Sequence, residues 1–176
     1  MPRTTYYTAT SLDGFIADPE ATLDWLLTRE NDADGLLNYD DFIRDVGAVA
    51  MGRTTYEWVL DHEGPDAAWP YTQPAWVFTH HEPRRVEGDI RFTQADVATV
   101  HAEMAEAAGD RGLWVVGGGD LAGQFADAGL LDEVVVYVAP VFLGDGAPLF
   151  PRRQELRLVE VGRNQEFAAA RYEIVK

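Results

Sequence analysis

The chain has 176 residues, contains no cysteine and carries a formal charge of −16 at pH 7. This length suits a single domain over residues 1–176, and the lack of cysteine excludes disulfides and thiolate chemistry. So acidic a surface repels nucleic acid and anionic membranes, and no apolar run reaches the about 20 residues of a membrane span. The N-terminus has no signal-peptide pattern, so we expect a cytoplasmic protein that binds neither nucleic acid nor membranes.

Strands and helices are expected to alternate along the first half of the chain. A strand over 4–10, rich in β-formers, leads into a turn over 11–17 that contains Gly14. The next expected elements, in chain order, are a short apolar helix at 23–27, a helix through 36–43 ending near Asp45, a buried strand at 46–51, a helix at 54–60 and a loop at 61–74.

The second half continues the alternation and ends in a hairpin. Its expected elements are strands at 75–79 and 90–92, a helix at 96–108, a strand at 113–116, a helix at 120–128, a strand at 133–138, a Gly/Pro-rich connection at 139–150, and closing strands at 156–161 and 167–175 joined by a turn near 162–164. This order predicts an α/β fold: a three-layer α/β/α arrangement around a mostly parallel, mixed sheet with an antiparallel C-terminal hairpin.

Two apolar runs break at glycine into polar residues that begin a helix. One continues as Gly52-Arg53-Thr54-Thr55 and the other as Gly117-Gly118-Gly119-Asp120-Leu121. Free N–H groups and the dipole at a helix start attract phosphate, so two such turns predict a ligand with several phosphates, such as a dinucleotide. A plain N-cap followed by a surface arginine is the alternative for the first turn.

The second turn fits the letters of G-x-G-x-x-A, yet its place in the chain argues against a Rossmann domain. That fingerprint normally follows the first strand of its unit, whereas most of this chain precedes Gly117. A third polar loop, Thr79-His80-His81, also follows a strand; its histidines have no third ligand at a fixed spacing, so no metal is expected. Because parallel strands end at one edge, these three loops are expected to converge on one crevice.

Four segments, in order, resemble the dihydrofolate-reductase-like superfamily, and within it the reductase of riboflavin biosynthesis (the RibD C-terminal domain type). The segments are Ser11-Leu12-Asp13-Gly14-Phe15-Ile16-Ala17, Met51-Gly52-Arg53-Thr54-Thr55-Tyr56-Glu57, Gly117-Gly118-Gly119 with Leu121, and 138–150, which is similar to an A-P-x-x-L-G-x-G-x-P-L-F signature. The resemblance runs almost end to end and is closer to small stand-alone members than to true dihydrofolate reductases.

The resemblance implies an NADPH-dependent reductase that transfers hydride to a C=N or C=O group of a small heterocyclic or sugar-linked substrate, similar to 5-amino-6-(5-phosphoribosylamino)uracil reductase. It implies a homodimer paired through the closing strands and the 139–150 segment. The residues that it places at NADPH are Ala9, Gly52, Arg53, Thr54, Thr55, Thr79, His80, His81, Val116, Gly117, Gly118, Gly119, Asp120 and Leu121.

The substrate side is less specified. Asp13 is the candidate catalytic acid, and the alternative is that it forms a turn beside Gly14. The candidate substrate contacts are Gly14, Phe15, Trp25 and Phe42. For Trp25 and Phe42 the alternative is a place in the apolar core. Leu36 stands where a true dihydrofolate reductase has a helix carboxylate, and Asp34 and Asp40 lie nearby without a matching local sequence. Folate reduction is therefore disfavoured. A catalytically silent NADPH-binding or regulatory protein on the same fold stays open, as does a flavin-dependent enzyme; the lack of a G-x-S-x-G elbow opposes an α/β hydrolase.

Overall fold

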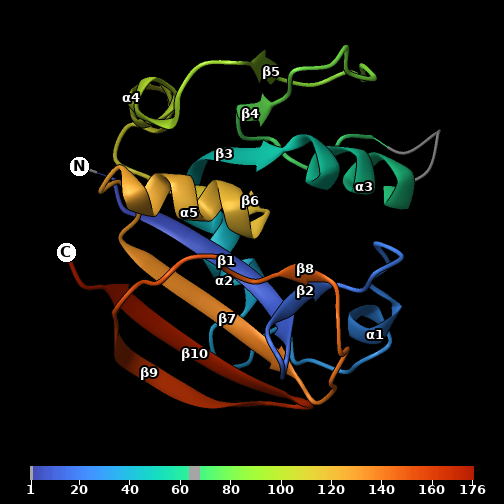
Figure 1. The fold of residues 1–176 in the computed structure, drawn as a ribbon. Helices are drawn as coiled ribbons and strands as arrows, with labels where there is room; N and C mark the ends of the chain where they lie inside the picture. Colours follow the sequence, from blue (N-terminus) through green and yellow to red (C-terminus); the bar gives the residue numbers. More distant parts are fainter. Residues whose placement is uncertain (1, 64–67) are drawn as a thin grey trace.

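The fold is built on an eight-stranded sheet, seen in a computed structural model that describes residues 2–63 and 68–176. The strand order is β5-β4-β3-β6-β1-β7-β10-β9, and every pairing from β5 to β7 is parallel (Figure 1). The strand bounds are β1 Thr4–Ser11, β3 Val46–Gly52, β4 Ala75–Phe78, β5 Ile90–Thr93, β6 Gly112–Gly117, β7 Glu133–Ala139, β9 Leu156–Asn164 and β10 Phe167–Ile174.

Helices cover both faces of this sheet, which confirms the predicted three-layer α/β/α arrangement. On one face, α4 (Val97–Ala108) and α5 (Gly119–Asp127) bury apolar side chains against β1, β3 and β6. On the other face, α2 (Tyr39–Arg44) and α3 (Arg53–Glu63) pack on β3, β4 and β6, and α1 (Asp24–Leu27) packs beside β7 and β10. No helix in the described part of the chain is long and apolar enough to cross a membrane.

A second, two-stranded sheet joins distant parts of the chain. The strands β2 (Phe15–Ala17) and β8 (Ala147–Pro148) pair in antiparallel fashion, with Phe15 opposite Pro148. Gly146 makes this pairing possible, because a Cβ there would lie 2.0 Å from the Ala17 carbonyl oxygen. The 139–150 connection is therefore anchored to the turn that follows β1.

Three predicted boundaries were wrong. The helix expected through 36–43 begins only at Tyr39, because Leu37 takes φ 57° and the Asn38 side chain caps the helix by accepting from Asp41 N. The hairpin turn falls at 165–166, because β9 continues through Gly162, where a Cβ would lie 2.5 Å from Leu36 Cδ2. The loop expected from 61 begins later, since α3 continues to Glu63; residues 64–67 of that loop lie outside the described residues.

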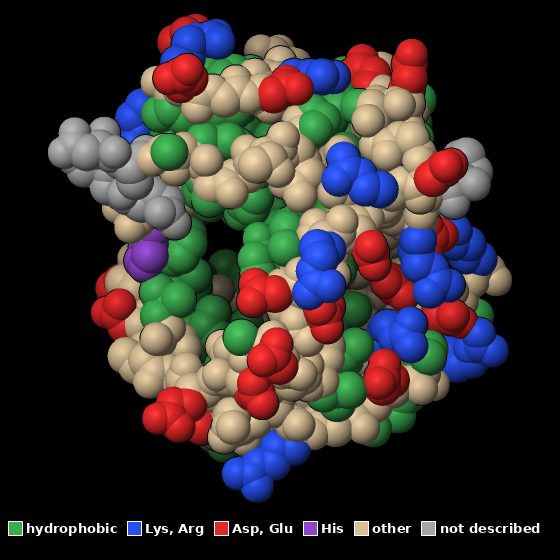
Figure 2. Space-filling view, turned by 180° about the vertical axis from the view of Figure 1, so that it is seen from behind, with side chains coloured by type: hydrophobic (Ala, Val, Ile, Leu, Met, Phe, Trp, Pro, Cys, Tyr) green, Lys and Arg blue, Asp and Glu red, His purple; other side chains and the backbone are tan. Residues whose placement is uncertain are grey.

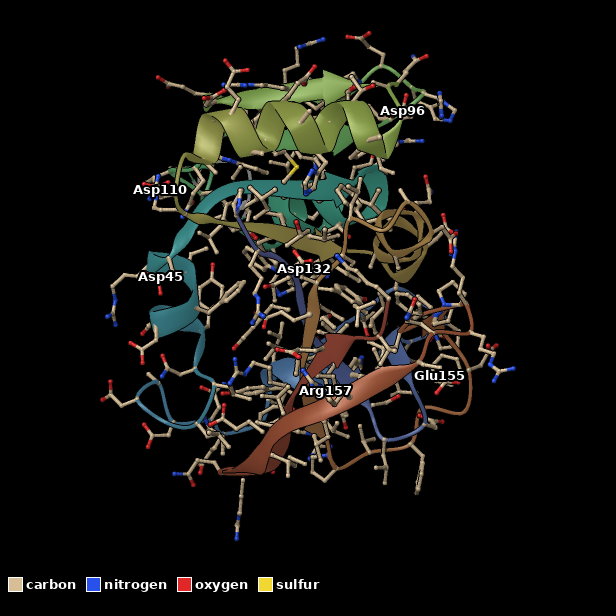
Figure 3. All side chains as sticks on the ribbon, turned by 90° about the vertical axis from the view of Figure 1, so that its left-hand side faces the viewer. Asp45, Asp96, Asp110, Asp132, Glu155 and Arg157 are labelled. Atoms are coloured by element: carbon tan, nitrogen blue, oxygen red, sulfur yellow. The ribbon has the colours of Figure 1, made fainter. Side chains whose placement is uncertain are left out.

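Acidic residues stand where parallel strands begin. Asp45, Asp110 and Asp132 each lie shortly before a strand (β3, β6 and β7), at the edge of the sheet that faces the viewer in Figure 3. Asp132 also accepts a hydrogen bond of 2.8 Å from Thr4 N at the start of β1. Negative charge is thus placed at the opposite end of these strands from the predicted phosphate-binding turns.

Candidate functional site

The three predicted cofactor loops lie side by side at the carboxyl ends of the parallel strands. Gly52 at the end of β3 is in register with Phe78 on β4, and Met51 is in register with Gly117 on β6. A Cβ on Gly52 would lie 3.8 Å from Gly117 O, and a Cβ on Gly117 would lie 3.5 Å from Thr55 Oγ1. The two glycine turns are therefore immediate neighbours, as the sequence predicted.

The strands β1 and β6 separate as they approach this edge. Their pairing ends at Tyr6 opposite Val115, although β1 stays paired with β7 as far as Ser11. Beyond that point the Trp114 indole donates to Tyr7 O at 3.1 Å. Ala9 and Val116, two of the predicted cofactor contacts, thus lie on neighbouring strands where the backbone ladder between them has opened.

The triple-glycine turn, Gly117-Gly118-Gly119, has no side chains of its own. Gly117 has φ 152°, which few other residues adopt, and a Cβ on Gly118 would meet Ile16 Cδ1 at 3.6 Å. Gly118 is the N-cap of α5, so the N–H groups of Gly119, Asp120 and Leu121 begin the helix without acceptors from a preceding turn. Such a turn lets a pyrophosphate approach the backbone closely.

The turn after β3 presents the N-terminus of α3. Arg53 is the first helical residue, Thr54 is exposed and Thr55 is half-buried beside Gly117. The Arg53 Nε donates to Glu57 Oε1 at 3.0 Å, and its side chain is 43% exposed. This i,i+4 pair keeps the guanidinium at the helix start, where its remaining N–H groups can meet an anion.

The loop after β4 adjoins Gly52 but uses its hydroxyl internally. Thr79 is buried, and its Oγ1 both donates to His81 O and accepts from His81 N, each at 3.1 Å. His80 and His81 are exposed. No group of three potential metal ligands occurs among the described residues. The loop can therefore offer imidazole and backbone groups to a ligand, while the Thr79 side chain shapes the turn.

The candidate acid, Asp13, is engaged by the backbone of a distant loop. Its carboxylate accepts from Ser11 Oγ at 2.6 Å, from Leu143 N at 3.0 Å and from Gly144 N at 2.7 Å. The Ser11 hydroxyl above all, and then the two amides, lower the pKa of this carboxyl because they stabilise its charged form. Asp13 thus holds the 143–144 turn, and its role as a proton donor stays a prediction that this geometry disfavours.

The predicted substrate contacts fall in three places. Phe42 stacks on Tyr7, with ring centroids 4.5 Å apart, and meets the edge of Trp114. Trp25 packs in a different cluster, near Tyr137, and donates its indole N–H to Thr22 O. Gly14 borders a cavity of about 440 Å³ on the α4/α5 side of the sheet, and Phe15 lies in β2.

The face opposite α4 and α5 is hollowed, and hydrophobic side chains form the walls of the hollow (Figure 2). An aromatic cluster belongs to this face: Tyr7, Tyr39, Phe42, Tyr71 and Trp114. Burial strongly raises the pKa of the Tyr7 hydroxyl, which donates to Leu37 O at 2.8 Å. Tyr7 is thus a neutral wall residue at neutral pH.

Sequence reasoning missed the contacts of the 147–152 segment with the start of α5. A Cβ on Gly119 would lie 2.4 Å from Leu149 O, so this segment crosses directly over the start of α5. The Arg152 side chain reaches Asp120 Oδ1 at 2.9 Å. The resemblance of residues 138–150 to the A-P-x-x-L-G-x-G-x-P-L-F signature indicated a conformation shared with the family. The contact of Leu149 and Arg152 with α5 could not be predicted, because it depends on the pairing of β2 with β8.

Comparison with known proteins identifies the family of this chain. The family model of the RibD C-terminal domain matches residues 2–166. The chain belongs to the RibD C-terminal domain family. A family of this kind supports a reductase of the riboflavin-pathway type.

Two curated proteins are similar to this chain in sequence. The chain is 33% identical over 149 residues to the uncharacterized protein YwjB of Bacillus subtilis, covering 84% of this chain and 82% of that protein. It is 34% identical over 162 residues to the riboflavin biosynthesis protein RibD of Corynebacterium ammoniagenes, where the match covers 82% of this chain and 45% of RibD. The chain thus spans less than half the length of that RibD.

Solved structures share the fold. A protein from Shewanella sp. PV-4, whose name refers to riboflavin biosynthesis, superimposes with a TM-score of 0.83 at 26% identity, covering 99% of both chains. A deaminase/5-amino-6-(5-phosphoribosylamino)uracil reductase from Thermotoga maritima gives a TM-score of 0.66 at 18% identity, covering 99% of this chain and 57% of that one. The predicted dihydrofolate-reductase-like fold is confirmed.

Proposed function

We propose that this protein is an NADPH-dependent reductase that delivers hydride to a C=N or C=O carbon of a small heterocyclic or sugar-linked substrate. The observation that carries the proposal is the meeting of two glycine turns, each followed by a helix start, at one edge of the parallel sheet. The similarity to 5-amino-6-(5-phosphoribosylamino)uracil reductases supports a substrate of that class.

The residues present fit a dinucleotide phosphate. The Gly117–Gly119 backbone and the first N–H groups of α5 would hold the pyrophosphate, because these three residues carry no side chains of their own. Arg53 and the adjacent Thr54 and Thr55 would bind a second phosphate group at the start of α3. The loop at 79–81 would contact the adenosine ribose and its 2′-phosphate.

The opening between β1 and β6 suits a flat ring. Ala9 and Val116 would face a nicotinamide there, and the bound cofactor would supply the hydride. The aromatic cluster beside it excludes water from the reacting carbon and fixes the plane of a heterocycle. Three hydrogen-bond donors stabilise the charged form of the Asp13 carboxylate, which opposes its candidate role as the proton donor.

Arg53→Ala tests the cofactor assignment. It should weaken NADPH binding by about tenfold or more, because a charge-assisted phosphate contact is lost. Isothermal titration calorimetry measures the dissociation constant, and Arg85→Ala is the matched control, since Arg85 is an exposed arginine that pairs with Glu82. An unchanged dissociation constant for Arg53→Ala would remove this residue from the site.

Substrate turnover tests the activity itself. Absorbance at 340 nm in the presence of 5-amino-6-(5-phosphoribosylamino)uracil and related carbonyl or imine compounds should fall as NADPH is consumed. Binding of NADPH without consumption by any of these substrates would favour the silent nucleotide-binding alternative, which the hydrogen-bonded Asp13 carboxylate makes worth testing. Absence of NADPH binding at millimolar concentration contradicts both functions.

We also propose that the protein pairs with a second copy through the edge strand β9. Leu158 and Val161 are 53% and 61% exposed, and their strand partners Tyr172 and Ala170 belong to the core on the α4/α5 side. Exposed apolar side chains on an edge strand favour association.

The acidic, cysteine-free composition further supports a cytoplasmic enzyme.

A further inference from the structure

The 147–152 segment lies across the start of α5 at two glycines one turn apart. A Cβ on Gly119 would lie 2.4 Å from Leu149 O, and a Cβ on Gly123 would lie 2.4 Å from Arg152 Nη1. Glycine at both positions therefore lets the segment and its arginine lie directly on the helix. The Arg152 side chain is only 23% exposed in this position.

Arg152 bridges two carboxylates on the same side of α5. Its Nη1 lies 2.9 Å from Asp120 Oδ1, and its Nε lies 2.7 Å from Asp127 Oδ2. Asp120 also accepts from Gln124 Nε2 at 2.8 Å. These two donors, Gln124 first and then Arg152, lower the pKa of the Asp120 carboxyl, so the group is an anion at neutral pH.

That anion stands in an unfavourable place for a phosphate ligand. Asp120 is the second residue of α5 and follows the triple-glycine turn directly. The chain carries a formal charge of −16, so no general excess of cations balances it. A carboxylate there repels a pyrophosphate at the helix start unless a fixed cation compensates its charge.

We propose that Arg152 is a positioning residue for NADPH binding: it neutralises Asp120 and holds the 147–152 segment on α5, so that the helix start accepts a pyrophosphate. The inference rests on the proposed cofactor. Arg152 acts through Asp120 and the helix, whereas Arg53 would meet a phosphate itself.

The same segment reaches the other side of the site. Leu149 N donates to Gly14 O at 2.8 Å, and Pro148 pairs with Phe15 in the two-stranded sheet. Anchoring by Arg152 therefore also fixes the 14–17 turn, whose Ile16 side chain lies next to Gly118. Loss of the anchor is expected to loosen both the triple-glycine turn and the 14–17 segment, which contains the candidate substrate contacts Gly14 and Phe15.

A charge-rescue cycle tests this role, with NADPH dissociation constants measured by calorimetry on the full chain. Arg152→Met keeps the aliphatic stem and should weaken binding by about tenfold, because Asp120 is left uncompensated. Asp120→Asn should tighten binding by about threefold, and the double variant should return to within about threefold of wild type. Salt should shrink the defect of Arg152→Met, since screening weakens the repulsion.

Two controls separate charge from packing. Arg153→Met should bind like wild type, because Arg153 is 90% exposed and pairs only with Glu155 among the described contacts. Arg152→Lys should stay within about threefold of wild type, since it keeps the charge and loses the forked geometry. Unfolding midpoints of the ligand-free proteins show whether each variant folds.

The outcomes distinguish this inference from the proposed function. Equal affinity of Arg152→Met and wild type, or a double variant as weak as Arg152→Met, overturns the neutralising role. If Arg152→Met folds poorly, the NADPH affinities of Arg152→Lys and Asp120→Asn decide the question. Weaker NADPH binding by Asp120→Asn than by wild type also overturns the neutralising role. No NADPH binding by the wild-type protein overturns the proposed function, and this inference with it.

Discussion

Gly119 and Gly52 are both glycines of the site, yet the structure predicts opposite consequences of replacing them with alanine. At Gly119 the new methyl group would lie 2.4 Å from Leu149 O and 2.5 Å from Pro148 O. Leu149 would have to withdraw by about 1 Å to reach ordinary contact, which strains its hydrogen bonds to Tyr6 Oη and Gly14 O. Overpacking of about 1–3 kcal/mol together with a hydrogen bond worth about 1 kcal/mol gives a loss of about 2–4 kcal/mol.

This loss should lower the unfolding midpoint of Gly119→Ala by roughly 5–15 °C, given about 2–4 °C per kcal/mol for a domain of this size. Gly52→Ala is the matched variant, because its methyl group would find Gly117 O at 3.8 Å, an ordinary contact. The free energy of unfolding of Gly52→Ala should stay within about 0.5 kcal/mol of the wild-type value. Its NADPH affinity should fall about tenfold, because the methyl group occupies space beside the turn that the phosphate would need. Differential scanning calorimetry and titration measure the two effects. A wild-type midpoint for Gly119→Ala would refute the close approach of the 147–152 segment.

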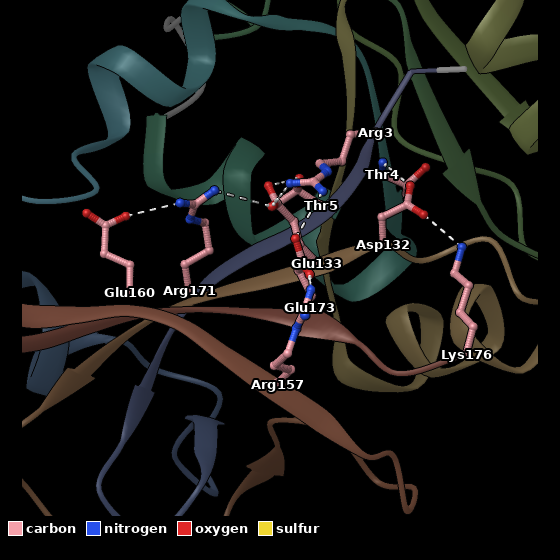
Figure 4. Close-up of polar contacts among 10 residues, drawn as sticks. All are labelled: Arg3, Thr4, Thr5, Asp132, Glu133, Arg157, Glu160, Arg171, Glu173 and Lys176. Carbon is pink, nitrogen blue, oxygen red and sulfur yellow. Dashed lines mark hydrogen bonds and ion pairs between the residues drawn. The ribbon is translucent and has the colours of Figure 1, made fainter.

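Three further predictions concern stability, pH and assembly. Glu133→Ala should lower the free energy of unfolding in urea by about 2–3 kcal/mol, because the Glu133 side chain is 11% exposed and binds Arg3 and Thr5 (Figure 4). Arg157→Gln, at a side chain that is 72% exposed, should lower it by less than about 1 kcal/mol. Equal losses for the two variants would contradict a buried network around Glu133. The stability difference between wild type and Asp13→Asn should be full above the ordinary carboxyl pKa of 3.8 and vanish as pH falls through the lowered folded value; a difference that persists in acid would show that the charge of Asp13 is not its source. Val161→Glu should yield a monomer in analytical ultracentrifugation, and an unchanged sedimentation coefficient would exclude β9 as the contact.

Most of the fold was predictable because its signals are local. Buried parallel strands read as apolar, β-branched runs, and α4 shows an apolar stripe at helical spacing beneath its Asp96 cap. The errors arose where a distant residue decides the local structure. The apolar residues at 36–43 belong to two separate clusters, with Leu36 and Leu37 in one and Phe42 and Ile43 in the other. Gly162 lies in β9, where Leu36 packs against it.

The neighbouring positions of the two glycine turns were predictable for a related reason. A glycine between a strand and a helix leaves a phosphate-binding signature in the sequence itself, as at Gly52 and Gly117. The contacts of Asp13 with 143–144 and of Arg152 with Asp120 and Asp127 join residues that are at least 25 positions apart, so no local pattern reports them. Sequence could therefore name a catalytic candidate at Asp13 without showing that its carboxylate already has three donors.

The distribution of charge makes a phosphate ligand compatible with so acidic a chain. Carboxylates such as Asp45, Asp110 and Asp132 stand where the parallel strands begin, at the edge away from the glycine turns. At the other edge, the helix starts contribute partial positive charge, and an acidic residue in the first turns of each helix has an arginine partner: Glu57 pairs with Arg53, and Asp120 with Arg152. A net charge alone would argue against binding a polyanion; the position of each charge along the strands argues for it.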